Sequence, residues 1–153
     1  MIRPDRRKAG FLAFRKLNGR VANMSVPFSM ILAVAAGGAL GAVGRFLVMS
    51  GIGRAFGHGF PIGTLAVNII GSFLLGALLE VMALKWSPSP EMRAFLVVGV
   101  MGAFTTFSTF SMDVVTLMTR GQMAAASAYV IASVTVCVLG FWLGMAALRQ
   151  VLT

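Results

Sequence analysis

The sequence predicts an all-α integral membrane protein with four transmembrane helices. Hydrophobic residues make up 58% of the 153 residues, charged residues make up only 11%, and the mean hydropathy is +0.91. This composition excludes an ordinary soluble domain. A bilayer core about 30 Å thick needs about 20 mostly apolar residues in each spanning helix. Behind its polar head the chain is long enough for four such helices, which we expect to form one small bundle over residues 29–150.

Polar breaks in the apolar pattern set the expected bounds of each helix. A Gly-rich loop that carries Arg54 and His58 follows the first helix, and Pro88 and Pro90 in WSPSPEMR prevent the second from continuing. The turn TRGQ separates the third helix from the fourth. The four predicted helices therefore cover residues 29–50, 62–84, 94–118 and 123–147.

The first 28 residues form a different kind of segment. Seven basic side chains against Asp5 alone give this head +6 of the net charge of +9. Basic segments of this kind stay cytoplasmic or lie along anionic headgroups. A secretory signal fits poorly, because the basic part is long and the apolar run behind it has full spanning length. We expect residues 1–28 to be a disordered extension or to be untranslated, with Met24 or Met30 as the true start.

Outside the head, basic residues divide evenly between the two ends of a four-helix bundle. This equal division gives the positive-inside rule nothing to act on, so a chain without the head can insert in both orientations and pair antiparallel. A retained head would instead hold the N-terminus inside; we favour the first interpretation. One end receives Lys85, Arg93 and Arg149, and the other receives Arg54 and Arg120 with Arg45 close by.

The third predicted helix contains the most informative stretch of the chain. Between Val98 and Ser111 it reads VGVMGAFTTFSTFS, with five hydroxyls, three phenylalanines and no charged residue. Hydroxyls at membrane depth face a cavity, a pore or another protein surface, and helix packing is the alternative. Gly99 and Gly102 followed by crowded hydroxyls are poor helix material. We expect a local break, whose freed carbonyls suit a hard cation such as Na⁺.

Aromatic and amide groups near this stretch are candidate anion ligands. Phe104, Phe107 and Phe110 recur every third residue, which predicts one stripe along a helix. Ring edges carry positive partial charge and can meet an anion, although packing is the commoner role of such a stripe. Asn68 offers amide hydrogens, with Thr64 one turn earlier on the same face. An interhelical hydrogen bond is the alternative role of Asn68.

Small residues and isolated polar residues complete the pattern. The pairs Gly37 and Gly41, and Gly140 and Gly144, each place two small residues on one helix face and indicate close helix packing within or between subunits. We expect an oligomer, since four helices enclose little room for an ion path. The sole cysteine, Cys137, lies in an apolar run, which predicts a small buried packing residue.

Two carboxylates lie near the polar stretch in sequence or in the expected bundle. Asp113 follows Ser111 closely, and Glu80 is near the end of the second predicted helix. We expect each to pair with a basic neighbour such as Arg45 rather than to carry protons across the membrane.

Three segments resemble the CrcB/Fluc family of fluoride channels. They are GGALGAVGRF at 37–46, GTLAVNIIGSFLLG at 63–76 and GAFTTFSTFS at 102–111. The similarity covers about residues 30–150, and the last two segments are highly specific in combination. The resemblance implies an antiparallel dual-topology homodimer with two fluoride pores, a broken third helix and a structural Na⁺ that is not transported.

The resemblance also implies which residues form the sites. The Na⁺ would be held by the backbone carbonyls of Gly102 and Thr105 from each subunit, and Arg45 would have a vestibule or structural position. The fluoride pore would be lined by Asn68, Phe107, Phe110, Thr64, Ser108, Thr109, Tyr129 and Ser133.

The expected function is that of a channel and not of an enzyme. The chain would export fluoride passively across the plasma membrane, the inner membrane if the cell is Gram-negative, with fluoride, a second copy and lipid as partners and no nucleic acid. A small proton-coupled four-helix multidrug-type transporter is the alternative, but it needs an acid inside the bundle that is protonated and released in each cycle. One His, one Cys and four scattered acids offer no nucleophile with a base at plausible spacing. A non-conducting assembly subunit stays open.

Overall fold

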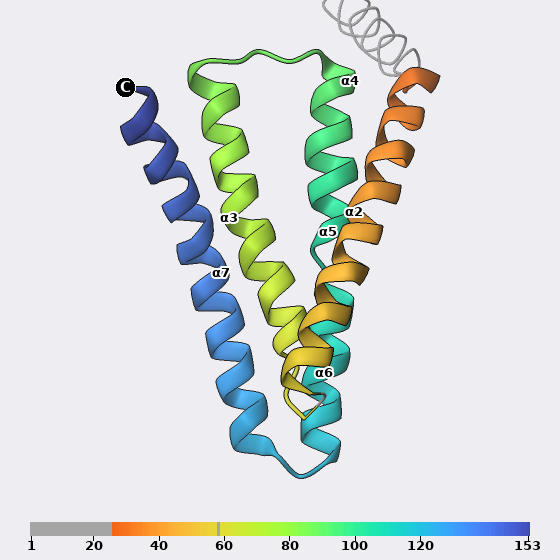
Figure 1. Cartoon of the computed structure of the whole chain (residues 1–153), viewed down its shortest axis with the longest axis vertical. Helices are drawn as coiled ribbons and strands as arrows, with labels where there is room; N and C mark the ends of the chain where they lie inside the picture. The colour runs from red at the N-terminus through yellow and green to blue at the C-terminus, as the bar shows by residue number, and fades with distance from the viewer. Residues whose placement is uncertain (1–25, 58) are drawn as a thin grey trace, which may run out of the picture.

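The computed structural model describes residues 26–57 and 59–153 and has four helical spans long and apolar enough to cross a membrane (Figure 1). No strand occurs in this described part of the chain, which confirms the all-α prediction. Residues 1–25, which form most of the basic head, and His58 lie outside the described part. The expectation that the head is disordered or untranslated therefore stays a prediction. The elements are α2 (Phe28–Phe56), α3 (Ile62–Leu84), α4 (Pro90–Arg93), the π-helix η1 (Ala94–Met101), α5 (Gly102–Phe104), α6 (Phe107–Thr119) and α7 (Met123–Leu152).

The second span has the predicted bounds, whereas the first and fourth are longer than predicted. Helix α2 continues past Ser50 until Gly57, whose positive φ of 77° ends it. Arg54 therefore lies in the last turn of α2, not in the loop, and its cation complements the helix dipole there. Helix α7 continues past Ala147 to Leu152 because no Gly or Pro follows to stop it.

Pro88 and Pro90 act as predicted, because α3 does not continue through them. Helix α3 ends at Leu84, ahead of both. Pro90 then occupies the first turn of α4, where its missing N–H costs nothing. The Ser89 side chain caps this turn by accepting a hydrogen bond from the Met92 N–H at 3.2 Å. The third span starts there, and α4, η1, α5 and α6 follow one another through it.

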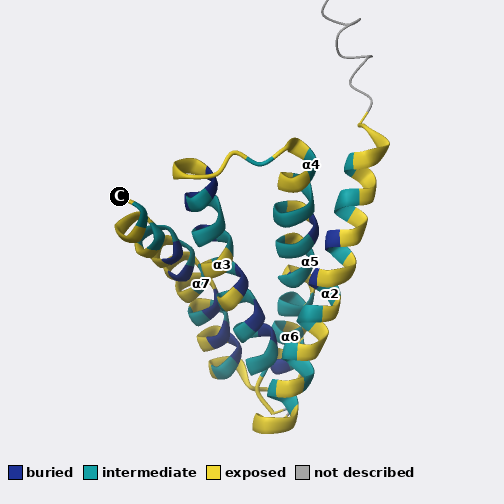
Figure 2. Ribbon diagram, turned by 45° about the horizontal axis from the view of Figure 1, so that its top comes forward, coloured by how far each residue is buried: buried dark blue, intermediate teal, exposed yellow. Residues whose placement is uncertain are grey.

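The spans pack as two pairs that diverge toward one end of the bundle (Figure 1). Helix α3 lies along α7, and α2 lies along η1 and α5. Buried residues follow these contact lines, while the outer faces are exposed (Figure 2). Gly37 and Gly41 of α2 contact the backbone of η1, and Gly144 of α7 contacts the backbone of α3. Both small-residue pairs predicted to bring helices together thus pack within one chain.

The contact at Gly41 gives a test of this packing. A Cβ at Gly41 would collide with the Val100 carbonyl and lie 3.1 Å from the Ala103 Cβ, whereas a Cβ at Gly38 meets nothing within 4 Å. We expect Gly41→Ala to lower the unfolding free energy by about 1–3 kcal/mol through overpacking. Gly38→Ala should be neutral or stabilising by up to about 1 kcal/mol, because alanine favours helix. Thermal unfolding in detergent, followed by tryptophan fluorescence, measures both; equal midpoints for the two variants would contradict the α2–η1 packing.

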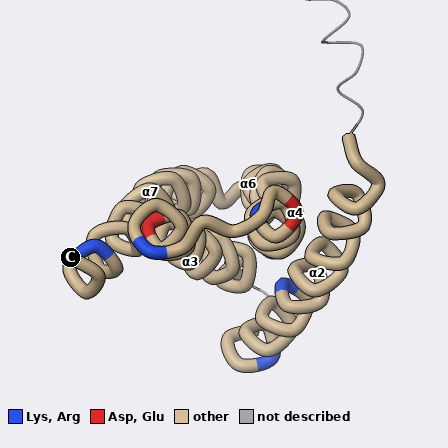
Figure 3. Tube along the Cα trace, turned by 90° about the horizontal axis from the view of Figure 1, so that it is seen from above, with Lys and Arg blue, Asp and Glu red and all other residues tan. Residues whose placement is uncertain are grey.

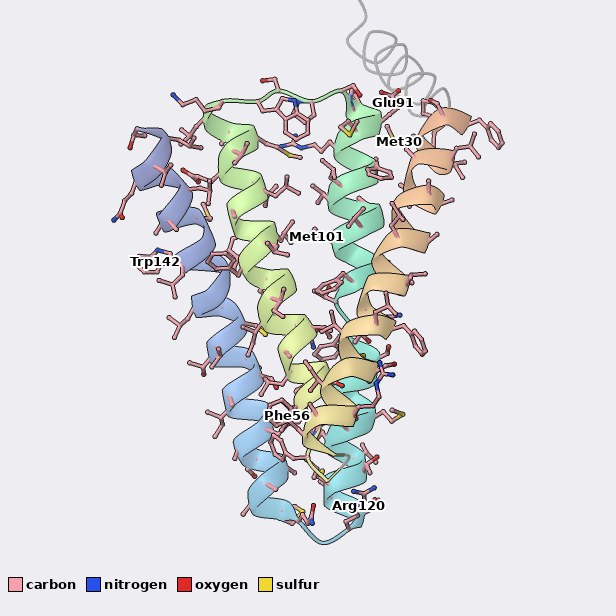
Figure 4. The ribbon with its side chains drawn as sticks, in the orientation of Figure 1. Met30, Phe56, Glu91, Met101, Arg120 and Trp142 are labelled. Atoms are coloured by element: carbon pink, nitrogen blue, oxygen red, sulfur yellow. The ribbon has the colours of Figure 1, made fainter. Side chains whose placement is uncertain are left out.

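The described chain buries few side chains and exposes many large apolar ones. Its buried hydrophobic residues are Val67, Met82, Leu117, Ala126 and Tyr129. Most of the Cα trace carries neither basic nor acidic residues (Figure 3). Trp142 is 62% exposed and points away from the bundle, while Glu91 and Arg120 lie at opposite ends (Figure 4). Such surfaces require a lipid or protein environment.

Candidate functional site: the break in the third span

The third span is interrupted at Thr105 and Thr106. Thr105 has φ −87° and ψ 161°, and Thr106 has φ −153° and ψ 117°, so both adopt extended conformations between α5 and α6. Thr106 caps α6: its hydroxyl accepts a hydrogen bond from the Thr109 N–H at 3.1 Å. The same hydroxyl lies 2.9 Å from the Thr109 hydroxyl and 3.2 Å from that of Ser108. The hydroxyl cluster therefore stabilises a helix start inside the membrane.

Asn68 on α3 holds this break from the side. Its Oδ1 accepts the Thr106 N–H at 2.8 Å, and its Nδ2 donates to the Thr106 carbonyl at 3.0 Å. The amide replaces the backbone partners that an interrupted helix leaves unmet. Asn68 thus makes the interhelical hydrogen bond that the sequence analysis gave as its alternative role. An amide has two N–H groups, and Thr106 engages only one of them within the described residues.

The break frees two backbone carbonyls. In a continuous helix the Thr106 N–H would donate to the Gly102 carbonyl, and the Thr109 N–H to the Thr105 carbonyl. Both donors are diverted, the first to Asn68 and the second to the Thr106 hydroxyl. These carbonyls are the two that the family resemblance assigns to Na⁺. Arg45 Nη1 on α2 donates to the Thr105 carbonyl at 3.3 Å, a contact that the sequence did not reveal.

Beside the break lies a hollow of about 320 Å³, here called the mid-span hollow. It brings together four predicted pore residues from three elements: Asn68, Phe107, Phe110 and Ser133. Thr105, Thr106 and Cys137 also line it, and no Lys, Arg, Asp or Glu of residues 26–57 and 59–153 does. Cys137 was expected to be a buried packing residue, but it is only half-buried on this wall.

A second, larger hollow of about 610 Å³, here called the end hollow, lies toward the α2–α3 and α6–α7 connections. Two further predicted pore residues, Thr64 and Thr109, line it. Thr64 and Asn68 therefore open onto different hollows, although one helical turn separates them. Unlike the mid-span hollow, this one has charged walls, formed by Arg45, Asp113 and Arg120.

A series of aromatic rings links the two hollows. The Phe107 and Phe110 centroids lie 5.3 Å apart, as do those of Phe110 and Tyr129, and Phe60 meets Tyr129 edge-on at 5.6 Å. Phe107 and Phe110 line the mid-span hollow, and Phe60 lines the end hollow. Tyr129 is fully buried, and its hydroxyl donates to Asp113 at 3.2 Å. No sequence pattern pointed to Phe60, because this residue lies in a loop.

The expectation of one continuous stripe of three phenylalanines is wrong. The break reorients the chain after Phe104, whose ring packs 3.1 Å from where a Cβ of Gly71 would lie and 3.6 Å from one at Gly44. Phe104 therefore fills the space between α2 and α3. Phe107 and Phe110 belong to a separate helix.

The expected partners of the two acids are only partly correct. Glu80 is 2% exposed and pairs with a basic residue, but this residue is Arg149 on α7, at 2.6 Å between Oε1 and Nε. Asp113 accepts from Tyr129 instead of Arg45. Arg45 donates to the Thr105 carbonyl instead of pairing with either acid.

These features define a class: a small multi-pass membrane protein with four spans, a broken helix and an uncharged polar hollow at the break. The sequence profile of the CrcB-like proteins, described as Camphor Resistance (CrcB), matches residues 32–145. The chain belongs to this family. The basic head lies outside the match.

Curated relatives align with this chain along almost their whole length. The chain is 53% identical over 120 residues to a protein of Rhodospirillum centenum, which covers 78% of this chain and 95% of the relative. A Nitrobacter hamburgensis protein is 52% identical over 111 residues, 72% of this chain and 88% of its own. An Agrobacterium fabrum protein is 49% identical over 120 residues, 78% and 96% of the two chains. The three are named fluoride-specific ion channels FluC. With its four spans, the chain is a multi-pass protein of the plasma membrane.

Proposed function

We propose that this chain forms a fluoride-selective channel that passively exports fluoride from the cytoplasm. The observation that carries the proposal is the mid-span hollow, where an amide, hydroxyls and three phenyl rings gather and no charged side chain of the described residues takes part. Fluoride is small and strongly hydrated, so its path must replace water with several donors. A buried Lys or Arg would bind the anion too tightly for it to leave. The names of the relatives support fluoride as the ion.

The proposed conducting unit is an antiparallel homodimer of dual topology. Phe107 lines the mid-span hollow and is 77% exposed, and the hollow carries polar groups at membrane depth. Lipid cannot satisfy those groups, whereas a second copy can cover them. Basic residues at both ends of the described bundle allow the two opposite orientations that such a pair requires.

A structural Na⁺, which is not transported, is part of the proposal and would be needed for activity. No cluster of three or more His, Cys, Asp or Glu occurs among residues 26–57 and 59–153, so backbone oxygen is the fitting donor. The carbonyls of Gly102 and Thr105 have lost their helical N–H donors and suit a hard cation. Two from each subunit would hold the ion, which would link the two breaks. The Thr105 carbonyl has a second lone pair for Arg45.

The other predicted pore residues would extend the path from the mid-span hollow to the end hollow. Thr64 and Thr109 supply hydroxyls there, and Tyr129 lies between the two hollows against Phe110. Ser108 would act at the start of α6, near the Thr106 cap. Arg45 and Arg120 on the wall of the end hollow would attract the anion toward this path.

Export would require no coupled energy source. Hydrogen fluoride enters from acidic surroundings, dissociates inside and leaves fluoride trapped as an anion. A negative interior then drives fluoride outward through any selective path. The proton-coupled transporter is less well supported, because Glu80 is held by Arg149 and Asp113 by Tyr129.

Reconstitution into liposomes tests this function. We expect vesicles that contain the protein to release loaded fluoride at least about tenfold faster than protein-free vesicles loaded in the same way. Chloride release should stay near the protein-free rate, because the path is selective. A fluoride electrode and a chloride electrode measure the two rates. After subtraction of the release from protein-free vesicles under the same gradient, which measures leakage of hydrogen fluoride through the lipid, reversing the proton gradient should leave fluoride release unchanged, whereas a coupled transporter would respond. Fluoride release no faster than from protein-free vesicles would refute the channel.

A further inference from the structure

Arg45 holds one of the two carbonyls that the break frees. Its Nη1 on α2 donates to the Thr105 carbonyl oxygen at 3.3 Å. The Thr109 N–H, which would bond this oxygen in a continuous helix, donates to the Thr106 hydroxyl instead. The guanidinium therefore takes the place of a missing backbone donor, and it brings a full positive charge to the break.

No carboxylate pairs with this charge in the part of the chain that the structure describes. The only ion pair among those residues joins Glu80 to Arg149. Asp113 lines the end hollow together with Arg45, but its Oδ2 accepts from the Tyr129 hydroxyl. Arg45 is only partly exposed, so solvent screens its charge less than that of a surface arginine.

A carbonyl oxygen that already accepts from a cationic group is a weaker ligand for a metal cation. The oxygen has two lone pairs, so a guanidinium and a metal ion can share it. The two positive charges nevertheless repel each other across a few ångströms. Inside a protein this repulsion is large enough to change a binding constant by about tenfold or more.

We propose that Arg45 is a positioning residue that sets the Na⁺ affinity of the break. Its charge on the Thr105 carbonyl keeps this affinity low. The inference rests on the Na⁺ site of the proposed function and adds a residue that does not itself contact the ion. The hydrogen bond from Arg45 supports the carbonyl without a metal, while the charge opposes the binding of one.

A purely supporting role of Arg45 predicts the opposite effect of substitution. If the guanidinium only held the Thr105 carbonyl in place, its loss would loosen the break and weaken Na⁺ binding. If its charge opposes Na⁺, loss of the charge strengthens Na⁺ binding even though the metal-free protein becomes less stable. The direction of the change in Na⁺ affinity therefore separates the two roles.

Thermal unfolding of the full chain in detergent measures this affinity without any transport assay. NaCl replaces N-methyl-D-glucamine chloride stepwise, so that the ionic strength stays constant. A cation that binds only the folded protein raises the unfolding midpoint once its concentration exceeds the dissociation constant. Arg45→Gln keeps an N–H donor and removes the charge. We expect its curve of midpoint against Na⁺ concentration to lie at least about tenfold lower in Na⁺ than the native curve.

Two matched variants test whether charge at this position is the cause. Arg45→Lys keeps the positive charge, and its curve should stay within about threefold of the native Na⁺ concentration. Arg54→Gln removes an equal charge from the exposed last turn of the same helix, where water screens it. Its curve should coincide with the native one.

The outcomes separate failure of this inference from failure of the proposed function. If native protein responds to Na⁺ but the Arg45→Gln curve coincides with it or lies at higher Na⁺, the role of Arg45 is overturned and the Na⁺ site stands. An Arg45→Lys curve displaced as far as that of Arg45→Gln would also overturn the role of charge. A native midpoint that does not respond to Na⁺ removes both the Na⁺ site and this inference, whereas fluoride efflux from liposomes still tests the channel independently.

Discussion

Asn68→Ala is expected to reduce fluoride efflux from liposomes by at least about tenfold. The amide holds Thr106 through two hydrogen bonds, and its second N–H has no partner among the described residues, so on the proposed function it would donate to fluoride. A hydrogen bond to a charged group contributes about 1.5–3 kcal/mol, and each 1.4 kcal/mol of barrier changes a rate by about tenfold. Removing the side chain also leaves the buried Thr106 N–H unmet, so the break itself loses a restraint. Efflux measured with a fluoride electrode gives the effect.

A matched variant distinguishes loss of this amide from loss of any polar group in a span. Thr135→Ala removes a hydroxyl from the exposed part of α7 and should leave efflux within about twofold, as surface substitutions generally do. Elution in size-exclusion chromatography shows whether both proteins remain folded and assembled. A folded Asn68→Ala protein with the native rate would exclude the amide from the path.

The positions of the four spans could be predicted from sequence because hydropathy and turn residues act locally. The bounds of α3 agree at both ends, where Pro61 precedes the helix and polar residues follow Leu84. Helix α2 was predicted too short because the prediction relied on the same local composition. Ser50 and the glycines behind it resemble a loop by composition, yet only Gly57 has the positive φ that ends the helix.

The break in the third span could be predicted, but its stabilisation could not. Crowded hydroxyls after Gly102 indicated a poor helix, and two extended residues do occur there. The residue that organises the break, Thr106, has its main partner Asn68 at a distance of 38 positions in sequence. Local patterns contain no information about such pairs. The contact of Arg45 with Thr105, 60 positions away, was missed for the same reason.

The break also changes what periodicity can predict. A spacing of three places side chains together only while the helix continues. Phe104 lies before the interruption and packs against the glycines of α2 and α3, whereas Phe107 and Phe110 lie after it. One uncharged interruption thus frees two carbonyls from helical hydrogen bonds and turns two aromatic rings toward a hollow. These two outcomes are the parts that the proposed channel requires.

The phenylalanines provide the second large expected effect. Phe107→Ile and Phe110→Ile should each lower fluoride efflux by at least about tenfold, because isoleucine lacks the positively polarised ring edge and the ring–ring contact at 5.3 Å. Phe104→Ile should act differently, since this ring fills space beside Gly71. We expect it to lower the unfolding free energy by about 1–3 kcal/mol, because core substitutions that change side-chain shape strain the packing.

Efflux and thermal unfolding measured on the same three proteins separate these roles. Phe107→Ile should unfold close to the native midpoint, because the Phe107 ring is 77% exposed, whereas Phe110→Ile should lower the midpoint slightly, because this ring packs against the buried Tyr129. Phe28→Ile, at the exposed start of α2, controls for loss of a ring at the surface and should change neither property. If Phe104→Ile abolished efflux in a stable protein while Phe107→Ile and Phe110→Ile conducted normally, the ion path would have to lie between α2 and α3, away from the mid-span hollow.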